Sequence, residues 1–188
     1  MPDFTLTPPP PLAGHDKTFG DLRLTSPADL ALVSLALPLG GEDAAQKAIK
    51  SAYGAALPAP GKSVCTKDGA RLVRLGPDAG MVIFTHATPD AERVVADRLN
   101  GAAYTTDQTD VWTGLELTGP PARAALERIC PLDLHDSAFA VDDAARTAME
   151  HLGVLIIRTG QDSFLLLSAS SSAGSFLHAV ETSIENTI

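Results

Sequence analysis

Apolar positions along the first half of this chain alternate between strand-like runs and helix-like spacing. The run Leu30–Leu37 is apolar and lies between two prolines, which favours a buried strand. From Glu42 to Tyr53 the apolar residues recur every three or four positions, which predicts an amphipathic helix that Gly54 would end. Short apolar runs predict three further strands, at 64–66, 71–75 and 81–84.

The same succession continues to the C-terminal end. Thr88 and Pro89 are typical of a helix start, and the helix that they open would end at Asn100. A second strand–helix step follows, with an alternating strand at 110–117 and a helix whose apolar face begins at Ala122. Three more strands at 144–149, 154–157 and 164–167 precede a last helix that the serines at 170–172 would cap.

An internal repeat connects the two halves of the chain. Residues 74–83 and 158–167 both read Arg-x-Gly-x-Asp-x followed by a strand, at an offset of 84 residues (158 − 74). Glycine and aspartate at these positions are typical of hairpin turns. The predicted fold class is therefore α+β: one domain over 28–188, made of two related strand-helix-hairpin-helix halves at about 28–105 and 106–188.

Residues 1–27 are expected to form a proline-rich arm outside this domain. Pro8–Pro11 is a stiff stretch that can join neither a helix nor a central strand. Two interpretations remain open, a disordered terminus or a strap along a partner that Phe4, Leu6 and Leu12 would anchor.

Charge and composition narrow the class of protein. The net charge of −9 and the absence of a basic run disfavour binding to nucleic acid. No apolar stretch approaches the ~18 residues needed to cross a membrane, and the acidic Met1–Phe4 segment does not fit a signal peptide. A cytoplasmic location is expected, where Cys65 and Cys130 would remain reduced.

The usual catalytic patterns are missing from the sequence. No histidine pair has ligand spacing, Cys130 and His135 are too local for a working dyad, and no phosphate-binding glycine motif occurs. Serines 168–175 are expected to cap a helix, and Asp142 and Asp143 to lie in a solvated loop. We therefore expect no catalytic, cofactor-binding or metal-binding residue in this chain.

A surface for a protein partner is the remaining candidate site. Trp112 lies on the less apolar side of its strand, which fits either a partner contact or a core residue under a helix. The segment after the 122–129 helix is the second part of this candidate interface. Its residues are Cys130, Pro131, Leu132, Asp133, Leu134 and His135.

Residues 115–135, which read LELTGPPARAALERICPLDLH, resemble the gamma subunit of heterotetrameric sarcosine oxidase. The Leu-x-Leu-x-Gly-Pro-x-Ala-Arg step and the Cys-Pro-Leu-Asp-Leu-His run are the most specific parts. Phe139 and three further segments fit the same family: 53–58, 75–78 and 158–167. The resemblance extends from about Ala28 to the last helix.

This resemblance implies more than the residues themselves show. It implies a fold like the folate-binding domain of the glycine-cleavage T-protein. It also implies a complex that oxidises sarcosine to glycine, produces hydrogen peroxide and forms 5,10-methylenetetrahydrofolate. The chain would be a non-catalytic companion packed on the large alpha subunit, with beta and delta subunits as further partners. FAD, FMN, NAD, tetrahydrofolate and zinc would belong to those partners. The alternative, which rests on the fold alone, is a free-standing folate- or small-ligand-binding protein of the T-protein type.

Overall fold

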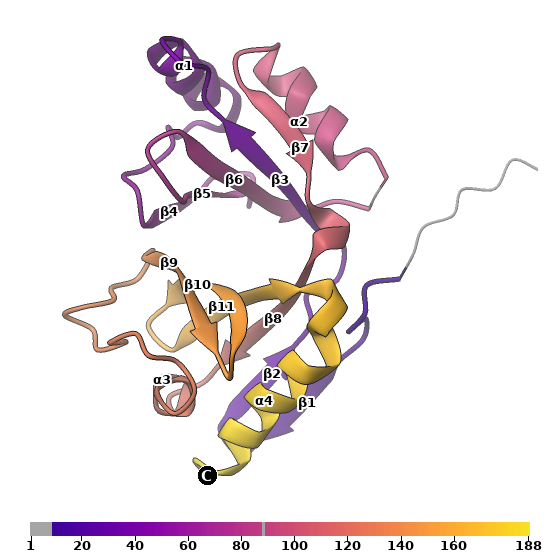
Figure 1. Cartoon of the computed structure of the whole chain (residues 1–188), viewed down its shortest axis with the longest axis vertical. Helices are drawn as coiled ribbons and strands as arrows, with labels where there is room; N and C mark the ends of the chain where they lie inside the picture. The colour runs from indigo at the N-terminus through magenta and orange to yellow at the C-terminus, as the bar shows by residue number, and fades with distance from the viewer. Residues whose placement is uncertain (1–8, 88) are drawn as a thin grey trace, which may run out of the picture.

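Two antiparallel sheets lie face to face between two pairs of helices in the computed structural model, which describes residues 9–87 and 89–188 (Figure 1). Helices α1 and α2 cover the outer face of one sheet, and α3 and α4 cover the outer face of the other. The order of layers is therefore helix, sheet, sheet, helix.

The first half of the chain forms the five-stranded sheet, in the order β4-β5-β6-β3-β7. Its outer helices are α1 (Glu42–Tyr53) and α2 (Ala91–Leu99). The strands are β3 (Leu30–Ala36), β4 (Lys62–Cys65), β5 (Arg71–Arg74), β6 (Ala79–Thr85) and β7 (Tyr104–Asp107).

The second half forms most of the six-stranded sheet, in the order β1-β2-β8-β11-β10-β9. Helices α3 (Ala122–Glu127) and α4 (Ala173–Glu185) cover it, and two 3₁₀ turns lie at Thr109–Val111 and Ser170–Ser172. The strands are β1 (Asp16–Phe19), β2 (Leu22–Thr25), β8 (Trp112–Thr118), β9 (Ala144–Met149), β10 (Leu152–Gly160) and β11 (Ser163–Ala169).

The duplication predicted from the sequence is confirmed by the strand order. In the first half β3 pairs with β6, β6 with β5, and β5 with β4; in the second half β8, β11, β10 and β9 pair in the same way. The first strand of each half also has a second neighbour in its sheet. Strand β7 pairs with β3, and β2 pairs with β8. The α+β class and the two related halves are therefore both correct.

Three apolar cores hold these layers together. One lies between the five-stranded sheet and α1 and α2, and a second lies between the six-stranded sheet and α3 and α4. The third lies between the two sheets, where Leu155 and Ile157 of β10 meet Val73 of β5 and Met81 of β6. Because β10 contributes alternate residues to the second and third cores, its apolar run is continuous.

Most predicted elements are confirmed with small changes at their ends. Helix α1 and strand β9 have the predicted bounds, and Gly54 ends α1 in the left-handed conformation at φ 72°. The helix from Ala122 is shorter than the pattern indicated. Asp90 is the N-cap residue of α2, and the predicted capping residue Thr88 lies outside the described residues.

The expected N-terminal arm needs the clearest correction. Residues 16–25, placed in the arm, form β1 and β2 and belong to the six-stranded sheet. Leu22 and Leu24 are fully buried, which gives this hairpin its apolar face. Strand β7 was not predicted at all. Within the described ranges, no helix has the length and apolar character needed to span a membrane.

Gly119, which follows β8, lies against the turn of the N-terminal β1–β2 hairpin. Its φ is +124°, and a Cβ atom there would overlap the carbonyl oxygen of Asp21 in the β1–β2 turn. We predict that Gly119→Ala lowers the free energy of unfolding by about 3 kcal/mol or more, through overpacking and backbone strain. Urea denaturation followed by circular dichroism measures this.

Gly174→Ala is the matched control, because Gly174 lies in the first turn of α4 and a Cβ there would meet nothing within 4 Å. This change should raise the free energy of unfolding by ~0.5–1 kcal/mol, the usual cost of helical glycine. Equal stabilities for the two variants would contradict the close approach of Gly119 to the hairpin.

Candidate functional site

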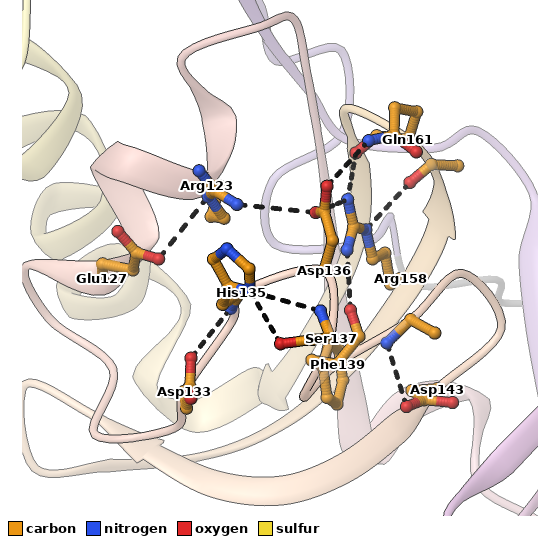
Figure 2. Close-up of polar contacts among 12 residues, drawn as sticks. Arg123, Glu127, Asp133, His135, Asp136, Ser137, Phe139, Asp143, Arg158 and Gln161 are labelled. Carbon is orange, nitrogen blue, oxygen red and sulfur yellow. Dashed lines mark hydrogen bonds and ion pairs between the residues drawn. The ribbon is translucent and has the colours of Figure 1, made fainter.

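The segment 130–143 connects α3 to β9 and contains six of the seven residues of the predicted interface. Its first part is a compact turn (Figure 2). Asp133 accepts a hydrogen bond from the backbone N–H of His135 at 3.0 Å. The His135 carbonyl accepts two more at 2.8 Å, from the N–H groups of Ala138 and Phe139. His135 Nδ1 accepts from the backbone N–H of Ser137 at 3.3 Å, so the ring is held against its own turn.

The side chain of Arg158, in β10, holds the middle of this segment in place through hydrogen bonds. Its side chain is 2% exposed and donates four hydrogen bonds. Nη1 donates to the carbonyl of Phe139 at 2.7 Å, Nε to that of Gly160 at 3.3 Å, and Nη2 to that of Gln161 at 2.6 Å. Nη2 also donates to Asp136 Oδ1 at 2.7 Å. These bonds use four of the five N–H donors of the guanidinium, which is how a buried charge is tolerated.

Asp136 is the outer member of the cluster and is half-exposed. The hydrogen bond from Arg158 lowers the pKa of its carboxyl group, and burial opposes this only in part. Gln161 donates to the other carboxylate oxygen at 3.2 Å, and Arg123 of α3 lies 3.5 Å away. Arg123 also pairs with Glu127 at 3.6 Å, so a charged network reaches from the segment onto α3 (Figure 2).

The end of the segment joins the two sheets. Asp142 accepts from Arg71 of β5 at 2.6 Å, and Asp143 forms an ion pair with Lys62 of β4. The backbone N–H of Asp142 also donates to the carbonyl of Arg158 at 2.8 Å. These two carboxylates were expected in a solvated loop. They instead form inter-sheet ion pairs, and Asp143 is only 9% exposed.

Arg74 is the counterpart of Arg158 in the first half, and its hydrogen bonds follow the same plan. Its Nε donates to the carbonyl of Gly76 at 3.2 Å, its Nη1 to that of Pro58 at 3.3 Å, and its Nη2 to that of Pro77. In the described part of the chain no carboxylate pairs with Arg74. The Arg158–Asp136 pair is thus an addition of the second half to an inherited arrangement.

The structure does not bring all seven predicted interface residues to one surface. Cys130 and Leu134 are buried in the core beneath α3 and α4. Trp112 lies on the other face of the same sheet, half-buried against the core between the sheets. The exposed members are Pro131, Asp133 and His135, with Leu132 partly buried. Both cysteines are free thiols, Cys65 exposed and Cys130 buried.

Sequence reasoning missed Asp136 and Arg158 as partners. The repeated Arg-x-Gly motif identified Arg158 as part of a hairpin, but the motif contains no sign of the carboxylate 22 residues earlier. The charged neighbours on α3 could not be predicted either, because helix and segment meet only in the folded chain.

A pocket of about 430 Å³ lies on the other side of the molecule, where the chain crosses from β2 to β3. Trp112, Pro9–Pro11, Asp29 and His86 contribute to its wall. The buried Trp112 Nε1 and Thr113 Oγ1 have no hydrogen-bond partner in the described chain. Such a pocket could accept a small polar ligand. Among the described residues, no group of three or more His, Cys, Asp or Glu side chains is arranged to hold a metal ion.

Comparison with solved structures first defines the fold. The glycine cleavage system aminomethyltransferase T from Bartonella henselae has the same fold, with a TM-score of 0.64 over 84% of this chain and 44% of that one. The sequences are 18% identical, so the likeness concerns the fold. The predicted T-protein-like architecture is confirmed.

A second solved structure matches with a higher TM-score and a higher sequence identity. A chain of heterotetrameric sarcosine oxidase from Corynebacterium sp. U-96 matches with a TM-score of 0.76 and 26% identity, over 90% of this chain and 87% of that one. Sarcosine oxidase subunit gamma from Corynebacterium sp. (strain P-1) is 32% identical over 132 residues, and that from Arthrobacter sp. is 33% identical over 125. These alignments cover 70% and 66% of this chain, and the chain spans only 65% and 62% of those relatives' length.

No family model matches the chain. The predicted resemblance to sarcosine oxidase gamma subunits is nevertheless confirmed, in sequence and in fold.

Replacing Arg158 tests whether its hydrogen bonds hold the segment. Arg158→Met keeps the length of the side chain but leaves buried carbonyls without a donor, so we predict a loss of roughly 3–5 kcal/mol in the free energy of unfolding. Arg74→Met is the matched control and should cost clearly less, because Arg74 is partly exposed and has no carboxylate partner among the described residues. Urea denaturation of both variants measures the difference, and equal losses would contradict the special role of Arg158.

The lowered pKa of Asp136 predicts how the stability of the protein changes at acidic pH. Because Arg158 lowers the folded-state pKa below the ordinary 3.8, the stabilisation by the charged carboxylate is complete above that pH. It is lost as pH falls through the lower folded value. Asp136→Asn should therefore be less stable than the original chain at pH 7, and the gap should narrow on acidification. Thermal unfolding between pH 7 and 3 measures this; a constant gap would show that the charge is irrelevant.

Proposed function

We propose that this chain is the gamma subunit of a heterotetrameric sarcosine oxidase and that its role is structural. The observation that carries the proposal is the match to a chain of that enzyme, which extends over nearly nine tenths of both chains. The sequence similarity to curated gamma subunits supports the same reading.

In this proposal the chain packs on the large alpha subunit, with beta and delta subunits completing the complex. The complex converts sarcosine to glycine and hydrogen peroxide and forms 5,10-methylenetetrahydrofolate. The partner subunits carry FAD, FMN, NAD, tetrahydrofolate and zinc, and the gamma chain contributes no catalytic residue. The complex works in the cytoplasm.

The exposed part of the 130–143 segment is the proposed contact. Pro131, Asp133 and His135 lie on a turn that its own hydrogen bonds order, and Arg158 holds the chain just after it, at Asp136 and Phe139. A surface that is already ordered loses less conformational entropy when a partner binds. Trp112 faces the other side of the sheet, so in this proposal it contributes to the fold or to a separate site.

A second candidate function is supported by the pocket beside Trp112. Trp112 and Thr113 both line this pocket and each has a polar side-chain atom without a partner in the described chain. A small ligand that accepts from the indole N–H would satisfy that of Trp112. The chain would then be a free-standing folate- or small-ligand-binding protein of the T-protein type.

Affinity purification tests the first candidate directly. The tagged chain is expressed in its native host during growth on sarcosine, and co-purifying proteins are identified by mass spectrometry. We expect a yellow complex with flavin absorbance that contains a large folate-type subunit. A colourless protein without partners would contradict the subunit proposal. Folate titration, followed through the fluorescence of the sole tryptophan, Trp112, would then test the second candidate.

A further inference from the structure

Three of the four sheet edges carry features that disfavour pairing with another chain. Strand β1 carries Lys17, whose ammonium group pairs with Glu181 and Glu185 of α4. The edges formed by β4 and β9 lie together at one end, where Lys62 of β4 forms an isolated backbone bridge with Asp143, the residue before β9. Charged side chains and mutual covering are the usual protections of an edge strand.

Strand β7 is the fourth edge: no strand of the described chain lies on its outer side, and its one charged residue, Asp107, is at its C-terminal end. Its sequence, Tyr-Thr-Thr-Asp, contains neither lysine nor proline, and its pairing with β3 shows no bulge. Tyrosine and threonine are residues that favour strands. Tyr104, Thr106 and Asp107 are exposed. Strand β7 therefore presents an open edge on which three of the four residues, Tyr104 to Thr106, favour strands.

The duplication shows what is missing beside β7. Its counterpart β2 pairs on one side with β8 and on the other side, antiparallel, with β1. In the described part of the chain no strand takes the place of β1 next to β7, which is why one sheet has six strands and the other five. The five-stranded sheet has room for one more strand, at a position already used in the other half.

The register identifies the free backbone groups. The N–H of Gln108 donates to the carbonyl of Leu32 at 2.8 Å, so hydrogen-bonded pairs between β7 and β3 fall on even-numbered residues. Thr105 and Asp107 are the alternate residues. Their backbone N–H and C=O groups therefore point away from β3, where an added strand would lie.

Two large apolar side chains lie at one end of this edge. Tyr104 is 69% exposed, and Leu39 is fully exposed. Tyr104 pairs with Ala36, the last residue of β3, and Leu39 follows three residues later. Because β7 has only four residues, backbone pairing alone would add few hydrogen bonds, and these side chains supply apolar contact area for a partner.

We propose that an extended segment of a partner subunit pairs antiparallel with β7, with apolar side chains against Tyr104 and Leu39 and a basic side chain near Asp107. This inference rests on the proposed function, because it needs a partner subunit. The net charge of −9 favours a basic partner segment and opposes pairing with a second copy of the same chain.

Hydrogen exchange in the purified complex tests the pairing directly. In the free chain the amides of Thr105 and Asp107 should exchange faster than those of Tyr104 and Thr106. In the complex the exchange of Thr105 and Asp107 should slow by about tenfold or more. A complex in which these amides exchange as fast as in the free chain would overturn this inference and leave the proposed function intact.

Two other outcomes count against the inference. If no complex forms, the proposed function fails and the inference fails with it. If protection appears in the free chain and rises with its concentration, the added strand comes from a second copy, and the proposed occupant is wrong.

A pair of variants provides a second, independent measurement. Thr106→Lys adds a charge to the open edge, and Thr18→Lys makes the same change on β1, which already carries a lysine. Both residues are exposed, so both variants should unfold at the temperature of the original chain. Thr106→Lys should weaken binding to the partner subunits by about tenfold or more, and Thr18→Lys should leave it unchanged. Equal binding by the two variants would contradict the proposed site.

Discussion

The apolar core between the two sheets is the constraint on which the rest of the structure depends. Each sheet is apolar on both faces: in β10, Val154 and Ile156 pack toward α3 and α4, while Leu155 and Ile157 pack toward the other sheet. Separating the sheets would expose eight large buried side chains, each worth about 1.5–3 kcal/mol. That sum, roughly 12–24 kcal/mol, is comparable with or larger than the whole 5–15 kcal/mol by which a typical domain is stable. We therefore expect each half to depend on the other for much of its stability, although each has its own helices and its own core beneath them.

The hydrogen bonds of Arg74 and Arg158 show the same duplication of the two halves. Arg74 and Arg158 each donate to the carbonyls two and three residues ahead and to one carbonyl upstream of the preceding edge strand. This agreement in detail is stronger evidence for a common origin of the halves than the strand order is. The difference between them is equally informative. Only Arg158 has a carboxylate partner in the described chain, and only its half has the long segment with Asp136. The arginine retains its packing role, and the added ion pair ties a surface segment to the core.

Hydrophobic periodicity predicted the elements that bury a regular face, and it missed the others for identifiable reasons. Helix α1 and strand β9 were placed correctly because their patterns span several periods. Strands β1 and β2 were missed because only Phe19, Leu22 and Leu24 mark their buried side, and the turn between the strands interrupts the period. Strand β7 was missed because none of its residues is fully buried. At the candidate site, Cys130 and Leu134 proved to be core residues, and the buried Arg158 gave no apolar signal at all. Its partner Asp136 is set by tertiary contacts that no local pattern contains.

The elements that periodicity missed are also those that distinguish the two halves. In the second half, the position beside β8 is filled by β2, and β1 adds a sixth strand beyond it. In the first half β7 follows α2 directly and has nothing beyond it in the described chain. Duplication alone would leave both sheets with equivalent edges. The N-terminal hairpin removes this equivalence, because it covers one edge with a strand that carries Lys17 and leaves the other edge open. The asymmetry of the molecule thus arises at the sheet edges, where interactions with other chains are decided, and not in its cores.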